Sequence, residues 1–310
     1  GSPIAYWISD NFTMSFKNHT KLGEFVRCAA GISTGDNETF LKLWNEVNFK
    51  NIAMGIKSDE EFKKSNYTYA LCNKGGGIRK WYGNNDYVAN WRRSDEFHRN
   101  GSTYRELLFI EGITWSEICL GNFSSRYYKD GQIFDHKSPG MFATPPEDLR
   151  LFLGLLNSKV VSIILQIINP TISTGADTLR KIPIANVWIK KNNIGMVTYR
   201  CILESKTDWD SYENSWDFTY HPLVEDVMYH TPTTTKLITI SDTYHSWVSE
   251  CEQRFFNLKA NEEELNRIFI DIYGLQDELT PEVLERDVTV HRVFDSKEDV
   301  PESMKGSAYI

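Results

Sequence analysis

The stretch NKGGGIRKWYGNNDYVANWRR, residues 73–93, combines three consecutive glycines with five basic residues, two tryptophans and two tyrosines. Its composition is too irregular for a helix or a strand, so it predicts a loop. Lysine and arginine neutralise phosphates, asparagine reads adenine edges, and aromatic rings stack on bases. The stretch therefore predicts either a nucleic-acid-binding loop or a solvated loop whose aromatic side chains fill the core.

The charge of the chain is unevenly distributed. The whole sequence carries a net charge of -8, and the last sixty residues hold 14 acidic against 7 basic side chains, a net charge of -7. Residues 73–105 instead hold seven basic against three acidic side chains. An acidic pI thus conceals a basic patch, which favours a polyanionic partner.

The length of 310 residues predicts about two domains with a substantial core. Five scattered cysteines without a Cys-x-x-Cys pair argue against a disulfide framework or a zinc site and indicate a reducing, cytoplasmic compartment. The sequence opens Gly-Ser-Pro without an initiator Met, which we interpret as a cleavage scar on a fragment of a longer protein.

The first 146 residues predict a capped amphipathic helix after Ser2-Pro3, then short strands and long polar loops. A strand is expected over residues 22–32, followed by a turn at 33–37 and an apolar run at 40–44. This part predicts an α+β fold with short mixed strands.

Residues 147–169 predict one long helix that is apolar nearly all round. A segment of this length and composition could be either a membrane span or a buried core helix. Lys159 near its centre would cost about 2.5 to 3.5 kcal/mol in a bilayer, so we expect a core helix and no membrane.

The C-terminal part predicts a helical spacer. Residues 188–234 show no clear period and are expected to be strand and loop, whereas residues 237–258 carry an apolar helical seam. A second helix is expected to start at Asn261 and to end at Gly274. We therefore predict a recognition domain at residues 1–235, a helical spacer or hairpin at 236–275, and an acidic, loosely ordered tail at 276–310.

The sequence contains no complete motif of a common nucleotide-binding or metalloprotease site. The dinucleotide, P-loop and zincin motifs are all missing. The glycines at 75–77 suit either a phosphate-cradling loop or a flexible turn. Glu204-Ser205-Lys206 has the spacing of a metal-dependent nuclease centre. The alternative interpretation is a solvated pair of charged residues on the surface. We predict no catalytic and no metal-binding residue in this chain.

Several ordered motifs together resemble one family. They are Gly31-Ile32-Ser33-Thr34-Gly35-Asp36-Asn37, Asn73-Lys74-Gly75-Gly76 with Arg79-Lys80-Trp81-Tyr82-Gly83, Glu111-Gly112-Ile113-Thr114-Trp115, residues 153–159, Asn169-Pro170-Thr171 and Lys181-Ile182-Pro183-Ile184. In this order they resemble the C-terminal specificity region of the PglX family, the adenine-specific DNA methyltransferases of BREX phage-defence systems, akin to type IIG restriction–modification fusions. Residues 258–275 resemble the helical spacer that follows it.

The resemblance implies target recognition rather than catalysis. Such methyltransferases bind S-adenosylmethionine in a separate domain and hold a flipped adenine with an Asn-Pro-Pro-Tyr motif. Asn169-Pro170-Thr171 lacks the second proline and the aromatic ring, so no cofactor is expected in this fragment, and S-adenosylmethionine is expected in its parent. The implied partner is double-stranded DNA, read as a short asymmetric site.

The candidate DNA-binding residues fall into four groups. Arg92, Arg93, Arg99 and Arg105 are expected to contact the phosphate backbone. The candidates for base edges are Lys74, Arg79, Lys80, Asn84 and Asn85, with Trp81 or Tyr82 supporting the loop. Thr34, Asp36 and Asn37 suit either a groove contact or a closed hairpin, and Lys181 suits either a phosphate contact or a packing role.

A protein-docking module is the alternative. In it, the helical seam and the acidic tail hold other subunits of a phage-defence complex, and the basic face is a target for phage DNA-mimic inhibitors. A metal-dependent nuclease built on Glu204 is the remote alternative.

Overall fold

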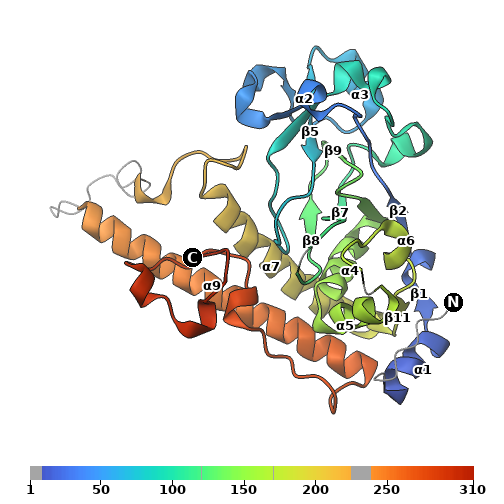
Figure 1. The fold of residues 1–310 in the computed structure, drawn as a ribbon, viewed down its shortest axis with the longest axis vertical. Helices are drawn as coiled ribbons and strands as arrows, with labels where there is room; N and C mark the ends of the chain where they lie inside the picture. The colour runs from blue at the N-terminus through green and yellow to red at the C-terminus, as the bar shows by residue number, and fades with distance from the viewer. Residues whose placement is uncertain (1–8, 120, 170, 225–238) are drawn as a thin grey trace.

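The computed structural model describes residues 9–119, 121–169, 171–224 and 239–310 (Figure 1). The helices and the separate sheets confirm the predicted α+β class. The α-helices are α1 (Asp10–Asn18), α2 (Asn37–Phe40), α3 (Asp59–Lys64), α4 (Leu149–Leu156), α5 (Lys159–Ile168), α6 (Ala176–Leu179), α7 (Lys191–Asp210) and α9 (Ile240–Tyr273). The strands are β1 (Thr20–Lys21), β2 (Val26–Ala29), β3 (Leu41–Leu43), β4 (Ile52–Ala53), β5 (Tyr69–Asn73), β6 (Tyr87–Asn90), β7 (Gly112–Trp115), β8 (Ser125–Tyr128), β9 (Gln132–Phe134), β10 (Gly140–Ala143) and β11 (Pro183–Ile184).

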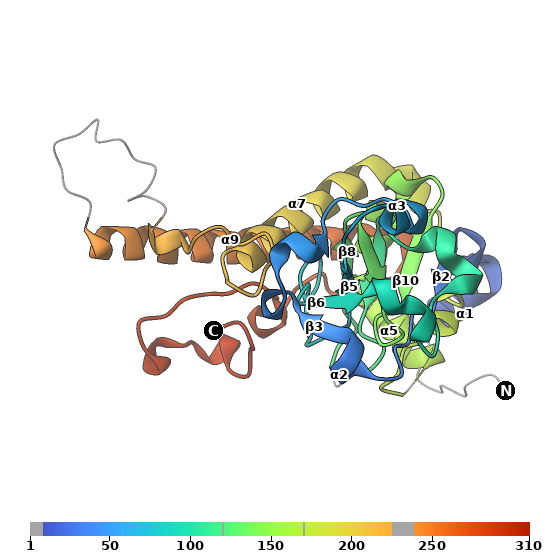
Figure 2. The same ribbon diagram turned by 90° about the horizontal axis from the view of Figure 1, so that it is seen from above.

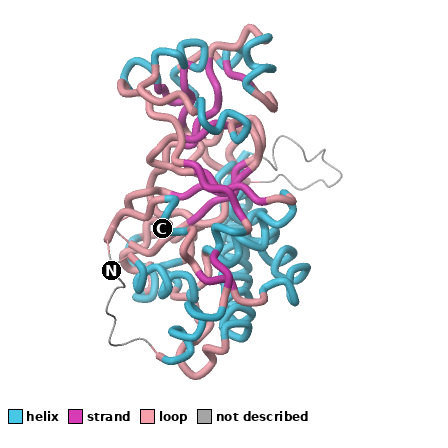
Figure 3. Tube along the Cα trace, turned by 90° about the vertical axis from the view of Figure 1, so that its right-hand side faces the viewer, coloured by secondary structure: helices cyan, strands magenta, loops and turns pink. Residues whose placement is uncertain are grey.

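Two sheets form the middle of the molecule. One has the strand order β2-β10-β7-β8 and is antiparallel throughout. The other has the order β3-β6-β5-β4, and β9 also pairs with β5; β4 and β9 run parallel to β5. Figure 1 shows α2 and α3 at the end of the molecule beyond the second sheet, whereas α1 lies at the opposite end, with α4 and α5 in between. Figure 3 shows the strands in the upper and middle parts, with helices crowded below them.

The largest hydrophobic core joins the first sheet to the long helices. It includes Ile113 and Met141 of the sheet, Phe152 of α4, Cys201 of α7 and Phe255 of α9, all buried. A second core lies beneath α3 and the second sheet. α7 and α9 pack along each other, and α9 extends well beyond the rest of the molecule (Figure 2).

The start of the chain follows the predicted pattern only in part. The cap predicted at residues 2–3 lies outside the described residues, and the described helix α1 begins after Ser9, whose side chain accepts from the N–H of Phe12. The strand predicted over 22–32 is limited to β2, because residues 22–24 form a 3₁₀ turn and Gly31 has a φ of 89°.

The single helix predicted at 147–169 is wrong in form, because α4 and α5 meet at a 75° bend. The bend has local causes: the Asn157 amide pairs with the backbone of Ser125, and Ser158 caps α5 by accepting from the N–H of Val161. The predicted burial is confirmed, since most residues of α4 and half of those of α5 are buried. Among the described residues no single helix is long and apolar enough to cross a membrane, and this bent pair passes that test only by length and composition.

The prediction of strand and loop for 188–234 is wrong for its first half, which contains the 20-residue helix α7. Its buried face combines apolar residues with Thr198, Ser205 and Asp208. These polar side chains break the apolar period on which the prediction relied.

Of the predicted helical spacer or hairpin, the hairpin form is wrong, because α9 runs without a break for 34 residues. Asn261 and the glutamates after it look like a helix start, yet Glu262 is a buried interior position that binds two side chains of the 73–93 stretch. Packing thus overrides local capping preference. Gly274 ends the helix as expected, with a φ of 67°.

The predicted loosely ordered tail is packed against the core. Val288, Val290 and Met304 are fully buried, and their side chains belong to the largest core. The boundaries at 235 and 275 stay a prediction, but residues from all three predicted parts share that core.

Candidate nucleic-acid interface

Arg79 lies inside the protein rather than on a surface loop. Its side chain donates to Asp208 at 2.7 Å and to the carbonyl of Tyr82 at 2.8 Å, and the residue is 2% exposed. The guanidinium also lies over the rings of Trp209 and Tyr309, at 4.9 and 5.5 Å. Arg79 therefore joins the 73–93 stretch to α7 and to the C-terminus.

Lys80 and Trp81 fasten the same stretch to α9. The Lys80 ammonium pairs with Glu262, and the Trp81 indole donates to the other oxygen of that carboxylate at 2.7 Å. The backbone N–H of Lys80 donates to the hydroxyl of Thr289 in the C-terminal segment at 3.0 Å. One buried carboxylate thus holds two neighbouring residues that the sequence assigned to DNA.

The backbone of the stretch turns sharply at several points. Trp81 and Asn84 adopt positive φ values of 72° and 58°, which non-glycine residues rarely do. Gly83 lies so close to Arg79 and Trp209 that a Cβ atom would come within 2.5 Å of the Arg79 Nε. This close approach requires glycine at that position.

The structure corrects the prediction of base-edge contacts for most of these side chains. Arg79 and Asn85 are buried, Lys80 is paired at a mostly buried position, and Trp81 and Tyr82 are buried as expected of residues that support the loop. Asn84 is partly exposed, but its amide donates to the Gly77 carbonyl at 2.9 Å. The apolar content of the stretch thus fills the core, which was the alternative to nucleic-acid binding.

The ionised groups around Arg79 depend on one another. Burial alone would raise the pKa of Asp208, but hydrogen bonds from His291 and the charge of Arg79 hold that pKa below its usual value. Burial raises the pKa of Asp86 to about 6, against the opposing charges of Arg79 and Arg126. Burial lowers the pKa of Arg126 to about 10, and this guanidinium makes no ion pair with any described residue.

The four arginines predicted to contact phosphate differ in their partners. Arg93 pairs with Glu96 and Arg105 with Asp59, both at 2.6 Å. Arg92 donates to carbonyls at the end of α3, including that of Tyr67 at 2.7 Å. Arg99 is exposed and makes no ion pair within the described ranges. These pairings weaken the electrostatic argument for a single basic patch and leave Arg99 as its strongest member.

The turn predicted at 34–37 lies directly beside Arg99. The backbones of Ser33 and Arg99 exchange two hydrogen bonds of 2.8 and 2.9 Å. Thr34 is buried and its hydroxyl donates to the Asn37 side chain, whereas Asp36 caps α2. Thr34, Asp36 and Asn37 thus close a local turn, and the exposed Asp36 and Asn37 share a surface with Arg99.

Two further loops continue this surface. The backbone of His136 donates to the Ile32 carbonyl at 2.7 Å, and Lys74 pairs with the neighbouring Asp135 at 3.0 Å. Together these segments form what we call the loop row, residues 33–37, 74–77, 98–99 and 135–137. It carries exposed polar groups that the sequence did not single out, namely His98 and Lys137, although the Lys137 ammonium pairs with Glu117 at 3.0 Å. Only their position beside the other loops in the folded chain indicates a role for these two residues, and no local sequence motif reveals that position.

Lys181 lies apart from the loop row. It is exposed at the end of α6, just before β11, and forms no ion pair in the part of the chain described here. Neither the phosphate contact nor the packing role predicted for it is decided by this position.

The two charged side chains of the remote nuclease motif have other partners. Glu204-Ser205-Lys206 lies on α7, where Glu204 accepts from Asn257 and Lys206 pairs with Asp210 and Asp217. Within the described residues no group of three or more acidic, histidine or cysteine side chains could hold a metal ion.

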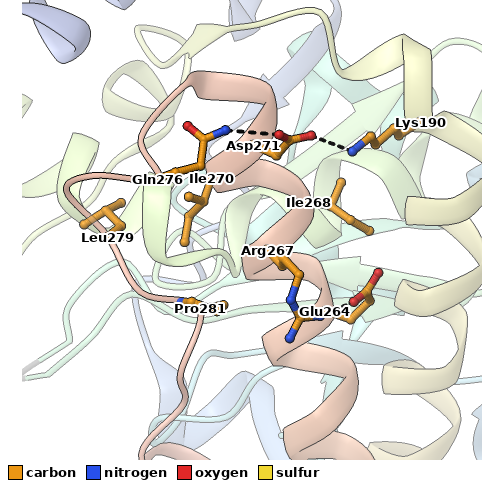
Figure 4. Close-up of a pocket in the computed structure, with 9 residues that line it drawn as sticks. All are labelled: Lys190, Glu264, Arg267, Ile268, Ile270, Asp271, Gln276, Leu279 and Pro281. Atoms are coloured by element: carbon orange, nitrogen blue, oxygen red, sulfur yellow. Dashed lines mark hydrogen bonds and ion pairs between the residues drawn. The ribbon is translucent and has the colours of Figure 1, made fainter.

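A pocket of about 410 Å³ lies near the end of α9 (Figure 4). Its charged groups pair with one another: Lys190 and Gln276 both contact Asp271, and Glu264 contacts Arg267. No described sheet is doubly wound and parallel, and these walls offer S-adenosylmethionine no free acceptor for its charged groups. The residues that line this pocket therefore do not fit that cofactor.

These features define an α+β module in which polar loops lie beside a mixed sheet and a buried ionic network fixes the long helices. No protein-family model matches the chain. The chain is homologous to a segment of the adenine-specific methyltransferases PglX and BrxX, which confirms the resemblance seen in the sequence.

PglX of Lacticaseibacillus casei (strain Zhang) is 37% identical over 304 residues, which cover 94% of this chain and 25% of the relative. BrxX of Escherichia coli O9:H4 (strain HS) is 30% identical over 286 residues, covering 90% and 22%. The chain thus spans about a quarter of the length of these relatives. A solved structure of the type IIL restriction-modification enzyme MmeI in complex with DNA is 12% identical, with a TM-score of 0.46, and is matched over 82% of this chain and 33% of that one.

Proposed function

We propose that this chain is the double-stranded DNA recognition module of an adenine-N6 methyltransferase in bacterial phage defence, and that it does not itself catalyse methylation. The observation that carries the proposal is its homology, over more than 90% of its length, to proteins named adenine-specific methyltransferases. The cofactor S-adenosylmethionine would then bind in the part of the polypeptide outside this chain.

The loop row is the surface that we assign to DNA. It brings exposed Arg99, His98 and Lys137 together with the polar side chains of Asp36 and Asn37. An arginine such as Arg99 contacts phosphates and fixes the orientation of the protein, whereas amide side chains read base edges. We therefore assign phosphate contact to Arg99 and base contact to Asn37, in place of the buried residues of the 73–93 stretch.

Binding to duplex DNA tests this assignment. The affinity of the chain for a duplex of mixed sequence is measured by fluorescence anisotropy at several salt concentrations. Arg99→Ala is expected to weaken binding and to reduce the log–log salt slope by about 0.9, the contribution of one phosphate contact.

The matched control is Arg286→Ala, an exposed arginine in the C-terminal segment. An unchanged slope for Arg99→Ala, or an equal effect of the two variants, would refute the assignment of the loop row. An absence of any salt-dependent duplex binding would refute the proposed function itself.

Docking of further defence-complex subunits is a second candidate function. It is favoured by a separate observation, the exposed apolar face of α7.

A further inference from the structure

The outward face of α7 and of the turn before it carries an aligned row of exposed apolar side chains. Ile189, Met196, Tyr199 and Leu203 are 75%, 50%, 42% and 44% exposed. Met196, Tyr199 and Leu203 follow one another on α7 at spacings of three and four residues, as in the a/d repeat of a helix that packs in a coiled coil, and Ile189 lies in the 3₁₀ turn before the helix. Scattered exposed apolar residues are ordinary, but this row, the α7 seam, has three members within about 10 Å along α7, at a rise of 1.5 Å per residue.

The α7 seam is not needed for the core of this chain. The opposite face of α7 is already buried against α4 and α9, through residues such as Ile194, Cys201 and Trp209. Both faces of the helix thus have the character of packing surfaces, and only one of them is covered. A helix that is apolar on two sides indicates a second packing partner.

Unpaired arginines lie along the α7 seam. The Arg150 guanidinium lies 4.5 Å from the centre of the Tyr199 ring, and an Arg200 nitrogen lies 3.9 Å from the sulfur of Met196. Neither arginine makes an ion pair with a described residue, and both are exposed. Glu204, the nearest acidic residue of α7 in sequence, accepts a hydrogen bond from Asn257 of α9 instead. The edge of the seam that carries Arg150 and Arg200 is therefore cationic, whereas the carboxylate of Glu204 lies toward α9.

This charge pattern selects the kind of partner. A second copy of the seam would bring arginines against arginines, which is unfavourable at an interface. A helix with an apolar stripe and carboxylates at its edges would cover the apolar row and pair with Arg150 and Arg200. The chain also spans only a quarter of relatives that are single longer polypeptides, so most of such a polypeptide is available to supply the helix.

We propose that the α7 seam docks an amphipathic, acidic-edged helix from the part of a PglX-type methyltransferase that lies outside this chain. The docking would fix the recognition module relative to the rest of the enzyme. The inference rests on the relationship to PglX and not on DNA contact by the loop row, so each can fail without the other.

Site-specific crosslinking tests the inference in a full-length protein. The matched segment of L. casei PglX is replaced by this chain, and a photoreactive phenylalanine analogue is placed at Leu203 on the seam or, as a control, at Glu60 on α3. Only the probe at position 203 is expected to crosslink within the same polypeptide, to a helix outside the chain that has acidic edges.

The charge of the edge is tested in the same protein. Arg200→Glu is expected to lower the crosslinking yield at position 203 about tenfold, whereas Arg286→Glu, on an exposed site elsewhere, should leave it unchanged. Crosslinks between two copies, crosslinks to DNA, no crosslink at position 203, or equal yields for the two charge variants would each overturn the inference. Circular dichroism of every variant confirms that it is folded.

Discussion

The buried pair of Arg79 and Asp208 should contribute more to stability than any exposed pair of the chain. Their side chains are 3% and 1% exposed, so water screens their interaction poorly. Asp208→Ala leaves the Arg79 guanidinium buried without its carboxylate and removes the acceptor of the His291 N–H. Breaking a buried pair in this way costs about 3 to 5 kcal/mol of the free energy of unfolding.

Urea unfolding, followed by tryptophan fluorescence at pH 7, measures this loss. Glu96→Ala is the matched control, because it removes the carboxylate of the exposed pair with Arg93 and should cost at most about 1 kcal/mol. Because the folded pKa of Asp208 lies below its unfolded value of 3.8, the stability from its ionised form is present above that pH and is lost as pH falls through the folded pKa. The advantage of the wild type should therefore shrink below about pH 4.

The double variant Arg79→Leu with Asp208→Leu separates the pair from its surroundings. Its loss should be smaller than the sum of the two single losses by at least about 1 kcal/mol, because no unpaired charge remains buried. If Asp208→Ala cost no more than Glu96→Ala, the claim that this pair holds the 73–93 stretch to α7 would be refuted.

Three further predictions concern the same framework. Gly83→Ala should lower the free energy of unfolding by more than about 1 kcal/mol in urea unfolding, because Gly83 has a φ of 115° and an added Cβ would clash with Arg79. Gly77→Ala is the control, because the space around Gly77 is open, and it should cost less. Equal losses for the two variants would contradict this reasoning. Met304→Ala should cost about 2 to 5 kcal/mol by thermal or urea unfolding, since Met304 is fully buried, and a loss below about 1 kcal/mol would mean that the C-terminal segment is not part of the core. Asp86→Asn should be more stable than the wild type at pH 7 and equal to it near pH 3.5, because the folded pKa of Asp86, about 6, lies above the unfolded value of 3.8, so that ionisation opposes folding. Urea unfolding of both proteins at both pH values tests this. The same difference in stability at the two pH values would show that burial does not set the pKa of Asp86.

The sequence predicted the fold class and the burial of the apolar helices because both depend on local composition. It could not predict the 75° bend, because the bend depends on Asn157 meeting the backbone of Ser125, a contact between distant segments. It missed α7 for a related reason, since Thr198, Ser205 and Asp208 occupy its buried face. Polar residues with partners inside a core erase the periodic signal on which such predictions depend.

The candidate site, too, depends on contacts between residues that are distant in the sequence. The 73–93 stretch has the composition of a DNA-binding loop, yet Asp208, Glu262 and Thr289, all far away in sequence, hold Arg79, Lys80 and the indole of Trp81 inside the protein. Arg99 instead reached the surface beside Asp36 and Asn37 through the pairing of two loop backbones. Residue types establish which chemistry is available, whereas tertiary partners decide which side chains remain free to use it.

The buried network and the loop row are also physically connected, and this connection bears on specificity. Lys74 at the start of the stretch pairs with Asp135 of the loop row, while Arg79 and Lys80, a few residues later, are fixed to α7 and α9. A rigid framework on one side therefore limits the positions that the glycine loop 75–77 and its neighbours can adopt on the other. Since direct readout of bases requires side chains held at defined places in a groove, stiffness of this kind is what a recognition surface needs. The ionic side chains of the stretch would on this reasoning serve DNA recognition indirectly, by holding the loop row in place rather than by touching the duplex.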